Sequence, residues 1–233
     1  MKKAGIAFFD IPYHSRLVTT QPIIRALVDR GHHVHGFTLE PYRDLLASAG
    51  AEVVLQPSFG PMPPEATLAL RTIEYSLSAV PAIIAELQAR KPALVLFTAK
   101  CLWAAIAAER CGLPTAVIHT NALLPRGAQV SAAVAAARWP DKTEEQIARC
   151  EARDQKAWAE CAARYSIKGV PAADVLPGLP NCMNLRGDLN LVYTSDALQP
   201  RRAEFDASYH FVGPCYDQRA ADADPAFAAE LAA

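Results

Sequence analysis

The sequence has no surplus of charge of either sign. Its 233 residues include 23 Lys and Arg against 24 Asp and Glu, which gives a formal net charge of −1 with histidine neutral. Binding to nucleic acid or to an anionic membrane surface depends on many Lys and Arg gathered on one face, because phosphates must be neutralised. The composition therefore indicates neither partner, and we expect no nucleic acid and no membrane.

The chain also lacks a long uninterrupted apolar run. A membrane-spanning helix needs about 20 mostly apolar residues, and the longest candidate, residues 92–114, is broken by Lys100. A buried strand followed by a helix explains that stretch better. Near the N-terminus, Asp10 and Pro12 interrupt the apolar residues well before the length of a signal-peptide core. These observations predict a cytoplasmic protein.

No cysteine spacing typical of a metal site or a disulfide framework is present. The six cysteines lie far apart, without a CxxC pair, so reduced and mostly buried thiols are expected at Cys101, Cys111, Cys150, Cys161, Cys182 and Cys215. Three histidines are close in sequence: His32 follows the helix-stopping Gly31, and His33 and His35 alternate along a predicted strand. Surface and core positions explain them better than a metal site, so no metal is expected.

Phosphate-binding loops are missing as well. Neither GxGxxG nor GxxxxGK[ST] occurs among the 11 glycines, and these patterns bring backbone N–H groups close to a phosphate. We therefore expect that this chain binds no nucleotide cofactor by itself. The same absence argues against a flavodoxin-like domain, which needs a phosphate-binding first loop.

What the sequence does contain is a repeated alternation of short apolar runs and amphipathic stretches. This alternation is typical of β-α-β units around a parallel sheet. The predicted strands are residues 4–10, 33–39, 51–57, 92–98, 114–120, 188–195 and 209–214. The predicted fold is an α/β, Rossmann-like parallel sheet of about seven strands with helices on both faces.

The connecting helices are marked by signals at their ends. Thr19 or Thr20 is expected to cap the first helix, with Pro22 in its first turn and Gly31 at its end. Further helices are predicted at residues 41–50, 68–90 and 101–112. Strand, helix and strand thus follow one another with short connections.

Three later segments depart from this alternation. Residues 122–166 are rich in alanine and charge, and they predict a helical insertion of two or three helices without a strand. Residues 169–184 carry several prolines and glycines and are expected to form a loop. Residues 215–233 are small, acidic and rich in alanine, as at the beginning of an interdomain linker. One domain is therefore predicted over residues 1–214.

The loop after the first strand is the first place to look for a site, because open parallel sheets bind ligands at the carboxyl ends of their strands. His14 lies in this loop. An unperturbed histidine, with a pKa of about 6.5, is mostly neutral at physiological pH and can accept a proton from a hydroxyl. The alternative is a loop histidine that only packs or caps a helix.

Three stretches of the sequence resemble one enzyme family. Residues 8–38, FFDIPYHSRLVTTQPIIRALVDRGHHVHGFT, resemble the opening of the macrolide-type glycosyltransferases of the GT-B fold. In that family a strand, a loop with histidine, a helix ending in RGH and a second strand occur in this order. Residues 91–119 resemble the family's fourth strand, helix and fifth strand, and residues 188–214 resemble the end of its acceptor domain. The resemblance covers nearly the whole chain and is weakest over residues 122–180.

The resemblance implies a function. His14 would be the general base that deprotonates an acceptor hydroxyl, which then attacks the anomeric carbon of a nucleoside-diphosphate sugar, such as a UDP-sugar, and inverts it. The family's aspartate at the end of the fourth strand, which holds the histidine, is replaced here by Thr98, and the glycine before the histidine is Tyr13. The donor sugar would be bound by a second domain, in the same or a separate chain. Without that domain we expect no activity.

The resemblance also implies a small hydrophobic acceptor, such as a natural product. Phe59 and Met62, in a loop rich in proline and glycine, and Trp103, at the start of a helix, are candidates for an apolar acceptor pocket. Asn121, directly after the fifth strand, lies at the edge where ligands bind. Core, loop or turn positions explain these four residues equally well.

A second function remains open at this stage. The chain is alternatively a non-catalytic partner or a small-molecule-binding subunit derived from such a domain, and Thr98 in place of an aspartate favours this reading. The carboxyl edge of the sheet, left uncovered without a donor domain, suggests a homodimer as a further hypothesis.

Overall fold

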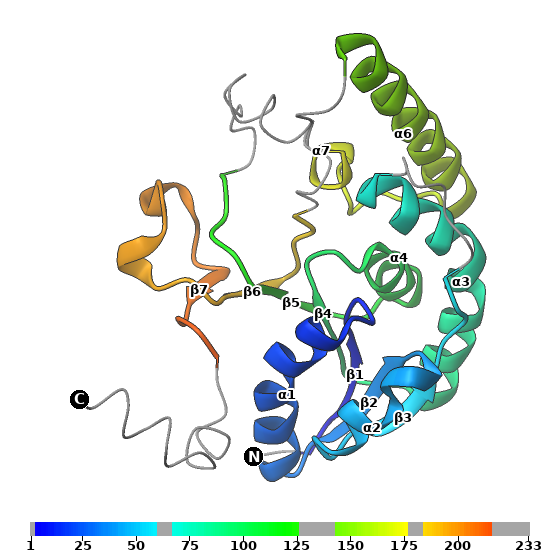
Figure 1. Cartoon of the computed structure of the whole chain (residues 1–233). Helices are drawn as coiled ribbons and strands as arrows, with labels where there is room; N and C mark the ends of the chain where they lie inside the picture. Colours follow the sequence, from blue (N-terminus) through cyan, green and yellow to red (C-terminus); the bar gives the residue numbers. More distant parts are fainter. Residues whose placement is uncertain (1–2, 60–66, 126–142, 177–183, 216–233) are drawn as a thin grey trace.

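A computed structural model describes residues 3–59, 67–125, 143–176 and 184–215. Within these ranges, seven strands form one sheet in the order β3-β2-β1-β4-β5-β6-β7, and every neighbouring pair is parallel (Figure 1). The strands are β1 Gly5–Phe9, β2 His33–Thr38, β3 Glu52–Leu55, β4 Leu94–Thr98, β5 Thr115–His119, β6 Leu189–Val192 and β7 Tyr209–Phe211. The predicted α/β class and the seven-stranded parallel sheet are confirmed.

Helices cover both faces of the sheet. On one face lie α1, His14–Asp29, and α2, Arg43–Ala47, which follows a short 3-10 helix η1, Glu40–Tyr42. On the other face lie α3, Leu68–Arg90, α4, Leu102–Cys111, and α6, Glu144–Tyr165 (Figure 1). Smaller elements are α7, Ala172–Val175, and the 3-10 helices η2, Asp196–Leu198, and η3, Arg202–Glu204.

The central strand β1 shows why the sequence folds in this way. Successive side chains of a strand point to opposite faces, so Ile6 and Phe8 pack under α1 while Ala7 and Phe9 pack under α3 and α4. All four side chains are at most 3% exposed. A strand covered on both faces needs apolar residues at every position, which explains the continuous apolar run in the sequence.

The helix α1 begins earlier than predicted. It starts at His14, so Pro22 lies in its interior rather than in its first turn. The Thr19 hydroxyl donates to the backbone carbonyl of Arg16 one turn back, at 2.7 Å. The Thr20 hydroxyl shares its single proton between the backbone carbonyl of Leu17 and the Asp10 carboxylate, each at 3.1 Å. The prediction of a threonine cap was wrong, because a threonine hydroxyl can also bond back to a carbonyl of its own helix.

Of the predicted helical insertion over residues 122–166, residues 144–165 form the helix α6, whereas the described residues 122–125 are not helical. The helix α6 begins with a capping box between Thr143 and Gln146, and the Tyr165 hydroxyl at its other end donates to the backbone carbonyl of Leu77 in α3 at 3.0 Å. The predicted loop at residues 169–184 contains the short helix α7, so that prediction was wrong at four positions. Residues 126–142 of the predicted insertion and 216–233 of the predicted linker lie outside the described residues.

The described cysteines are free thiols, as predicted. Cys101, Cys150 and Cys161 are buried, Cys111 and Cys215 are partly exposed, and Cys182 lies outside the described residues. Burial raises the pKa of the Cys161 thiol to about 11. Among the described helices, none has both the length and the apolar character that a membrane crossing requires.

The close approach of α2 to β2 depends on a glycine. A Cβ atom at Gly36 would lie 2.9 Å from Cδ1 of Leu46 and 3.2 Å from Cβ of Ala51. We expect Gly36→Ala to lower the free energy of unfolding by ~1–3 kcal/mol, because the added methyl overpacks this contact. Urea denaturation measures the change. Gly5→Ala is the matched control, since its Cβ would come no closer than 3.6 Å to Pro92, and equal losses in the two variants would contradict the packing argument.

Candidate functional site

The sheet changes direction of winding between β1 and β4. From β1 the chain adds β2 and then β3 on one side, and it returns to add β4, β5, β6 and β7 on the other side. In sheets of this kind, ligands bind outside the carboxyl ends of the strands at such a switch point. Two polar side chains stand at this point: Asp10 directly follows β1, and Thr98 is the last residue of β4.

Asp10 is a buried carboxylate held by three donors of the chain. Its side chain is 1% exposed. One carboxylate oxygen accepts from the Thr98 hydroxyl at 2.6 Å and from the Ile11 backbone N–H at 2.7 Å, and the other accepts from the Thr20 hydroxyl at 3.1 Å. Burial raises the pKa of Asp10 above its ordinary value, although these bonds and the charge of Arg16 act in the opposite direction.

Asp10 was missed as a site residue in the sequence. The sequence presented it only as an interruption of an apolar run. The usable signal was its position, because an acidic residue that directly follows the first strand of a doubly wound sheet lies at the switch point. Its partner Thr98 is 88 residues away in the chain, and this pairing requires the strand order.

The Asp10 cluster makes a prediction about pH. A carboxyl group with a raised pKa binds its proton more strongly in the folded than in the unfolded chain, so its contribution to stability falls as pH rises through the folded pKa. We therefore expect the stability of Asp10→Asn, which removes the buried charge, to increase relative to that of the unchanged chain as pH rises from 4 to 7. Urea denaturation at both pH values measures the difference, and a constant difference would count against a buried charge at this position.

His14 lies at the same edge of the sheet as the Asp10 cluster. It is the first residue of α1 and is exposed. Within the described part of the chain, no side chain forms a hydrogen bond or ion pair with it. The Thr98 hydroxyl is directed to Asp10 and not to His14. The imidazole is therefore open to solvent and to a ligand, and no described neighbour fixes its orientation.

Two residues further along α1, a side chain ties the helix to a distant strand. Arg16 donates from its guanidinium to the hydroxyl of Thr120, which directly follows β5, at 2.6 Å. Since β4 separates β1 from β5 in the sheet, this bond extends over the end of β4. It fixes the first turn of α1, and with it His14, against the carboxyl edge.

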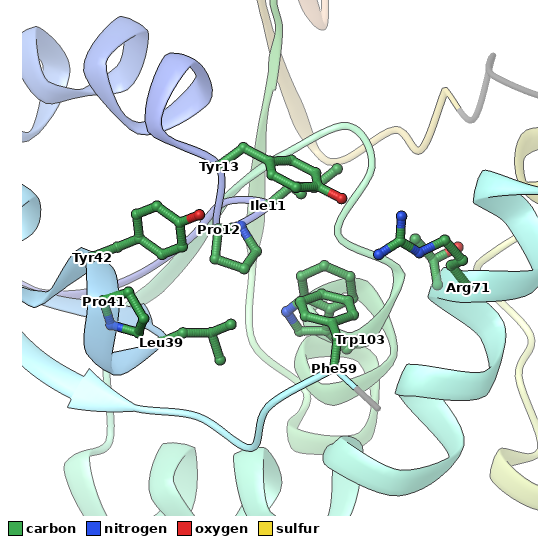
Figure 2. A pocket seen from close by; sticks show the side chains of 10 residues that line it. Ile11, Pro12, Tyr13, Leu39, Pro41, Tyr42, Phe59, Arg71 and Trp103 are labelled. Carbon is green, nitrogen blue, oxygen red and sulfur yellow. The ribbon is translucent and has the colours of Figure 1, made fainter. Parts of the chain in front are cut away.

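An apolar cavity opens beside this edge. Its volume is about 280 Å³, and Figure 2 shows its walls coming from the loops after β1, β2 and β3 and from α3 and α4. The lining residues are Ile11, Pro12, Tyr13, Leu39, Pro41, Tyr42, Phe59, Arg71, Thr72 and Trp103. Tyr13 is the residue directly before His14, so the cavity lies against the segment that bears the candidate base.

Two aromatic residues of the cavity wall, Phe59 and Trp103, pack together with Tyr75 behind them. Phe59 stacks on Tyr75 with a centroid distance of 3.9 Å, and the edge of Trp103 meets both rings at 5.4 and 4.8 Å. The Tyr75 hydroxyl donates to the backbone carbonyl of Pro57 at 2.7 Å and so holds the loop that carries Phe59. Offset and edge-to-face contacts of this kind give a firm wall.

The structure brings together some of the predicted acceptor residues. Phe59 and Trp103, which come from a loop and a helix 44 residues apart, both line the cavity. Asn121 is exposed beyond β5 and is not among the lining residues. Met62 lies outside the described residues. Tyr13, Tyr42 and Arg71 were missed, because nothing in the local sequence places them on one cavity.

His33 and His35 of the histidine cluster lie at the opposite, amino end of the sheet. His33 is exposed and His35 is buried, which are the surface and core positions that were predicted. The Nε2 atom of His33 lies 2.9 Å from a carboxylate oxygen of Glu52, and Nδ1 of His35 lies 3.4 Å from it. Ligand atoms of these three residues fall within 4.8 Å of one another. However, the Arg90 guanidinium contacts both Glu52 and His35, so an ion-pair cluster with its own cation occupies this place. Glu52 was not foreseen as a member.

Comparison with known proteins supports the resemblance seen in the sequence. No protein-family model matches the chain. The oleandomycin glycosyltransferase of Streptomyces antibioticus is 29% identical over 227 residues, which cover 93% of this chain and 50% of the relative. The chain thus spans about half the length of the relative that it matches.

Solved structures share the fold. The glycotransferase of kitacinnamycin superposes with a TM-score of 0.69 at 22% identity, over 96% of this chain and 54% of that protein. The calicheamicin glycosyltransferase CalG4 gives a TM-score of 0.68 at 20% identity, over 92% and 53%. SsfS6 of Streptomyces sp. SF2575, in complex with thymidine diphosphate, gives 0.51 at 13% identity, over 90% and 52%. The predicted resemblance to natural-product glycosyltransferases of the GT-B fold is confirmed.

Proposed function

From this resemblance we propose that the chain is the acceptor-binding half of an inverting glycosyltransferase that acts on a hydrophobic small molecule. One observation carries the proposal. An apolar cavity of about 280 Å³ lies at the switch-point edge of the sheet and is lined by Tyr13, the neighbour of the candidate base His14. Concave, mostly apolar sites with few polar groups are typical of small-molecule binding.

In the proposed reaction, the neutral imidazole of His14 accepts the proton of an acceptor hydroxyl. The hydroxyl oxygen forms a bond to the anomeric carbon of a nucleoside-diphosphate sugar, while the bond from that carbon to the diphosphate oxygen breaks. The diphosphate leaves with the bonding electrons, and the anomeric configuration inverts. Because the diphosphate is already a good leaving group, positioning of the two reactants and a placed base supply most of the acceleration.

The donor sugar is assigned to a second domain. The relative and the solved structures are about twice as long as this chain, and one of the latter holds thymidine diphosphate. We propose that the corresponding half, in the same or a separate chain, binds the nucleoside-diphosphate sugar. Catalysis then takes place between the two halves, at the carboxyl edge that carries His14.

A specific observation supports a second, non-catalytic function. At the position of the family's aspartate, the Thr98 hydroxyl donates to the buried Asp10, and no described side chain orients His14. A histidine without an orienting partner is a weaker base in practice, because its useful tautomer and direction are not fixed. The alternative is therefore a subunit that holds the same class of small molecule without transferring a sugar.

Sugar transfer distinguishes the two functions. The chain is assayed with UDP-glucose and with TDP-glucose against aromatic and macrolide acceptors, alone and together with the donor half of a related enzyme. We expect product only in the presence of the donor half. Stable association of the two halves and acceptor binding without any product would instead support the non-catalytic subunit.

A further inference from the structure

The cavity carries a single charged side chain among its described lining residues, and this is Arg71. Arg71 lies in the first turn of α3 and is half-buried. Figure 2 shows its guanidinium directed across the mouth of the cavity toward the hydroxyl of Tyr13. In the described part of the chain, no carboxylate pairs with it. A cation thus faces an otherwise apolar space.

This position contrasts with that of other arginines at the same edge. Arg43, close to Tyr42 of the cavity wall, forms a bidentate pair with Glu40 at 3.0 Å for both bonds. Arg16 is bound to Thr120. Half-buried cations are normally paired, because loss of water around the charge has a cost that a nearby anion offsets. Among the described residues, Arg71 has no such anion, and its guanidinium faces the cavity.

A second unsatisfied group lies deeper in the cavity. Trp103 is fully buried, and among the described residues no acceptor receives its indole N–H. Figure 2 shows the indole nitrogen turned toward the space beside Leu39 and Pro12. A buried donor without a partner costs about 1–3 kcal/mol, so an oxygen atom of a ligand in this space would be bound favourably.

We propose that the acceptor is a flat aromatic compound that carries an ionised acidic group and a second oxygen. The acidic group, a carboxylate or a phenolate, pairs with Arg71 at the mouth. The second oxygen accepts a hydrogen bond from the Trp103 N–H deep in the cavity. The ring system lies along the wall formed by Phe59 and Trp103. This inference rests on the proposed function, since it specifies the acceptor of the same site.

Direct binding of three matched probes tests the inference without requiring catalysis. The probes are anthraquinone-2-carboxylate, its methyl ester, and anthracene-2-carboxylate. The last has the same three fused rings but lacks the two ketone oxygens. Isothermal titration calorimetry with the full chain measures each dissociation constant. We expect the anthraquinone acid to bind about tenfold more tightly than its ester, because a hydrogen bond to a charged group contributes more than a neutral one.

Two variants separate the two contacts. Arg71→Gln should abolish the preference for the acid over the ester, whereas Arg149→Gln, at an exposed site on α6, should leave it unchanged. Trp103→Phe keeps a flat ring without the N–H. It should weaken both anthraquinone probes by about fivefold and leave anthracene-2-carboxylate unaffected. Circular dichroism confirms that each variant is folded.

The outcomes also separate this inference from the proposed function. Equal binding of acid and ester, or an acid preference that survives in Arg71→Gln, overturns the inference while the cavity remains an acceptor site. Loss of anthracene-2-carboxylate binding in Trp103→Phe, in proportion to the anthraquinones, overturns the role of the N–H. If none of the three probes binds, both the inference and the proposed acceptor site fail.

Discussion

Replacement of His14 by alanine is expected to lower sugar transfer by about 10²–10⁴-fold in the chain completed by a donor half, which is the usual contribution of a general base. The residue is exposed at the first position of α1 and lies beside the cavity without lining it. Its removal should therefore reduce kcat and leave acceptor binding nearly unchanged. Initial rates at saturating donor, together with calorimetry of the acceptor, measure the two effects.

The matched control for this prediction is His33→Ala. His33 is exposed in a strand, as His14 is exposed on its helix, but it lies at the opposite end of the sheet beside Glu52. We expect its transfer rate to stay within about twofold of the unchanged chain, as is usual for a surface residue far from the reaction. A similar loss in both variants, or full activity of His14→Ala, would remove His14 from the mechanism.

A second large effect is expected in stability at low pH, and it comes from His119 at the end of β5. Burial lowers the pKa of His119 to about 4, and the charge of Arg186 acts in the same direction. The folded chain therefore binds fewer protons than the unfolded chain between the two pKa values, so stability falls as pH falls through this window. From pH 6.5 to pH 4, the loss assigned to His119 is about 3 kcal/mol.

Burial keeps His119 neutral even though its hydrogen bond with Asn190 favours the charged form. Its Nε2 lies 3.2 Å from Oδ1 of Asn190. The amide nitrogen of Asn190 donates to the backbone carbonyl of Gly187, and Oδ1 accepts the Gly187 N–H. The amide oxygen therefore faces the imidazole, which must donate from Nε2. Nδ1 is buried, and no partner for it exists among the described residues, so a proton there would have no acceptor.

The variant His119→Gln tests this account, because glutamine is neutral at all these pH values and can still donate to Asn190. Urea denaturation at pH 7 and pH 4.5 should show a smaller loss of stability for His119→Gln than for the unchanged chain. His33→Gln serves as the exposed control and should lose as much as the unchanged chain. The account is wrong if all three proteins lose the same amount.

The sheet was predictable from the sequence because each strand carries a local signal. A continuous apolar run between turn residues marks β1, β4 and β5, and burial on both faces is the physical cause of such runs. Ends of helices were predicted less well than their centres. Gly112, with a φ of 63°, ends α4 as expected. Thr20 was expected to cap α1 but bonds back within its own helix, and a threonine can do either.

The site was only partly predictable, because its contacts join distant parts of the chain. The position of His14 after the first strand could be inferred from the fold rule alone. The pairing of Thr98 with Asp10 and the meeting of Arg71 with Tyr13 at one cavity depend on strand order and side-chain direction. A single sequence contains neither, so the cation at the cavity was missed, whereas the acidic residue at the switch point could have been found from its position after the first strand.

The position of β1 in the middle of the sheet has a consequence for biosynthesis. Among the described strands β1 is synthesised first, yet one of its two neighbours, β4, follows more than 80 residues later, as the separation of 88 residues between Asp10 and Thr98 shows. Until then one edge of β1 has no partner strand, and the Asp10 carboxylate lacks the hydroxyl of Thr98. Such non-local pairings slow folding and leave edges open to aggregation. A nascent chain that pauses between β3 and β4 should therefore depend most on chaperones.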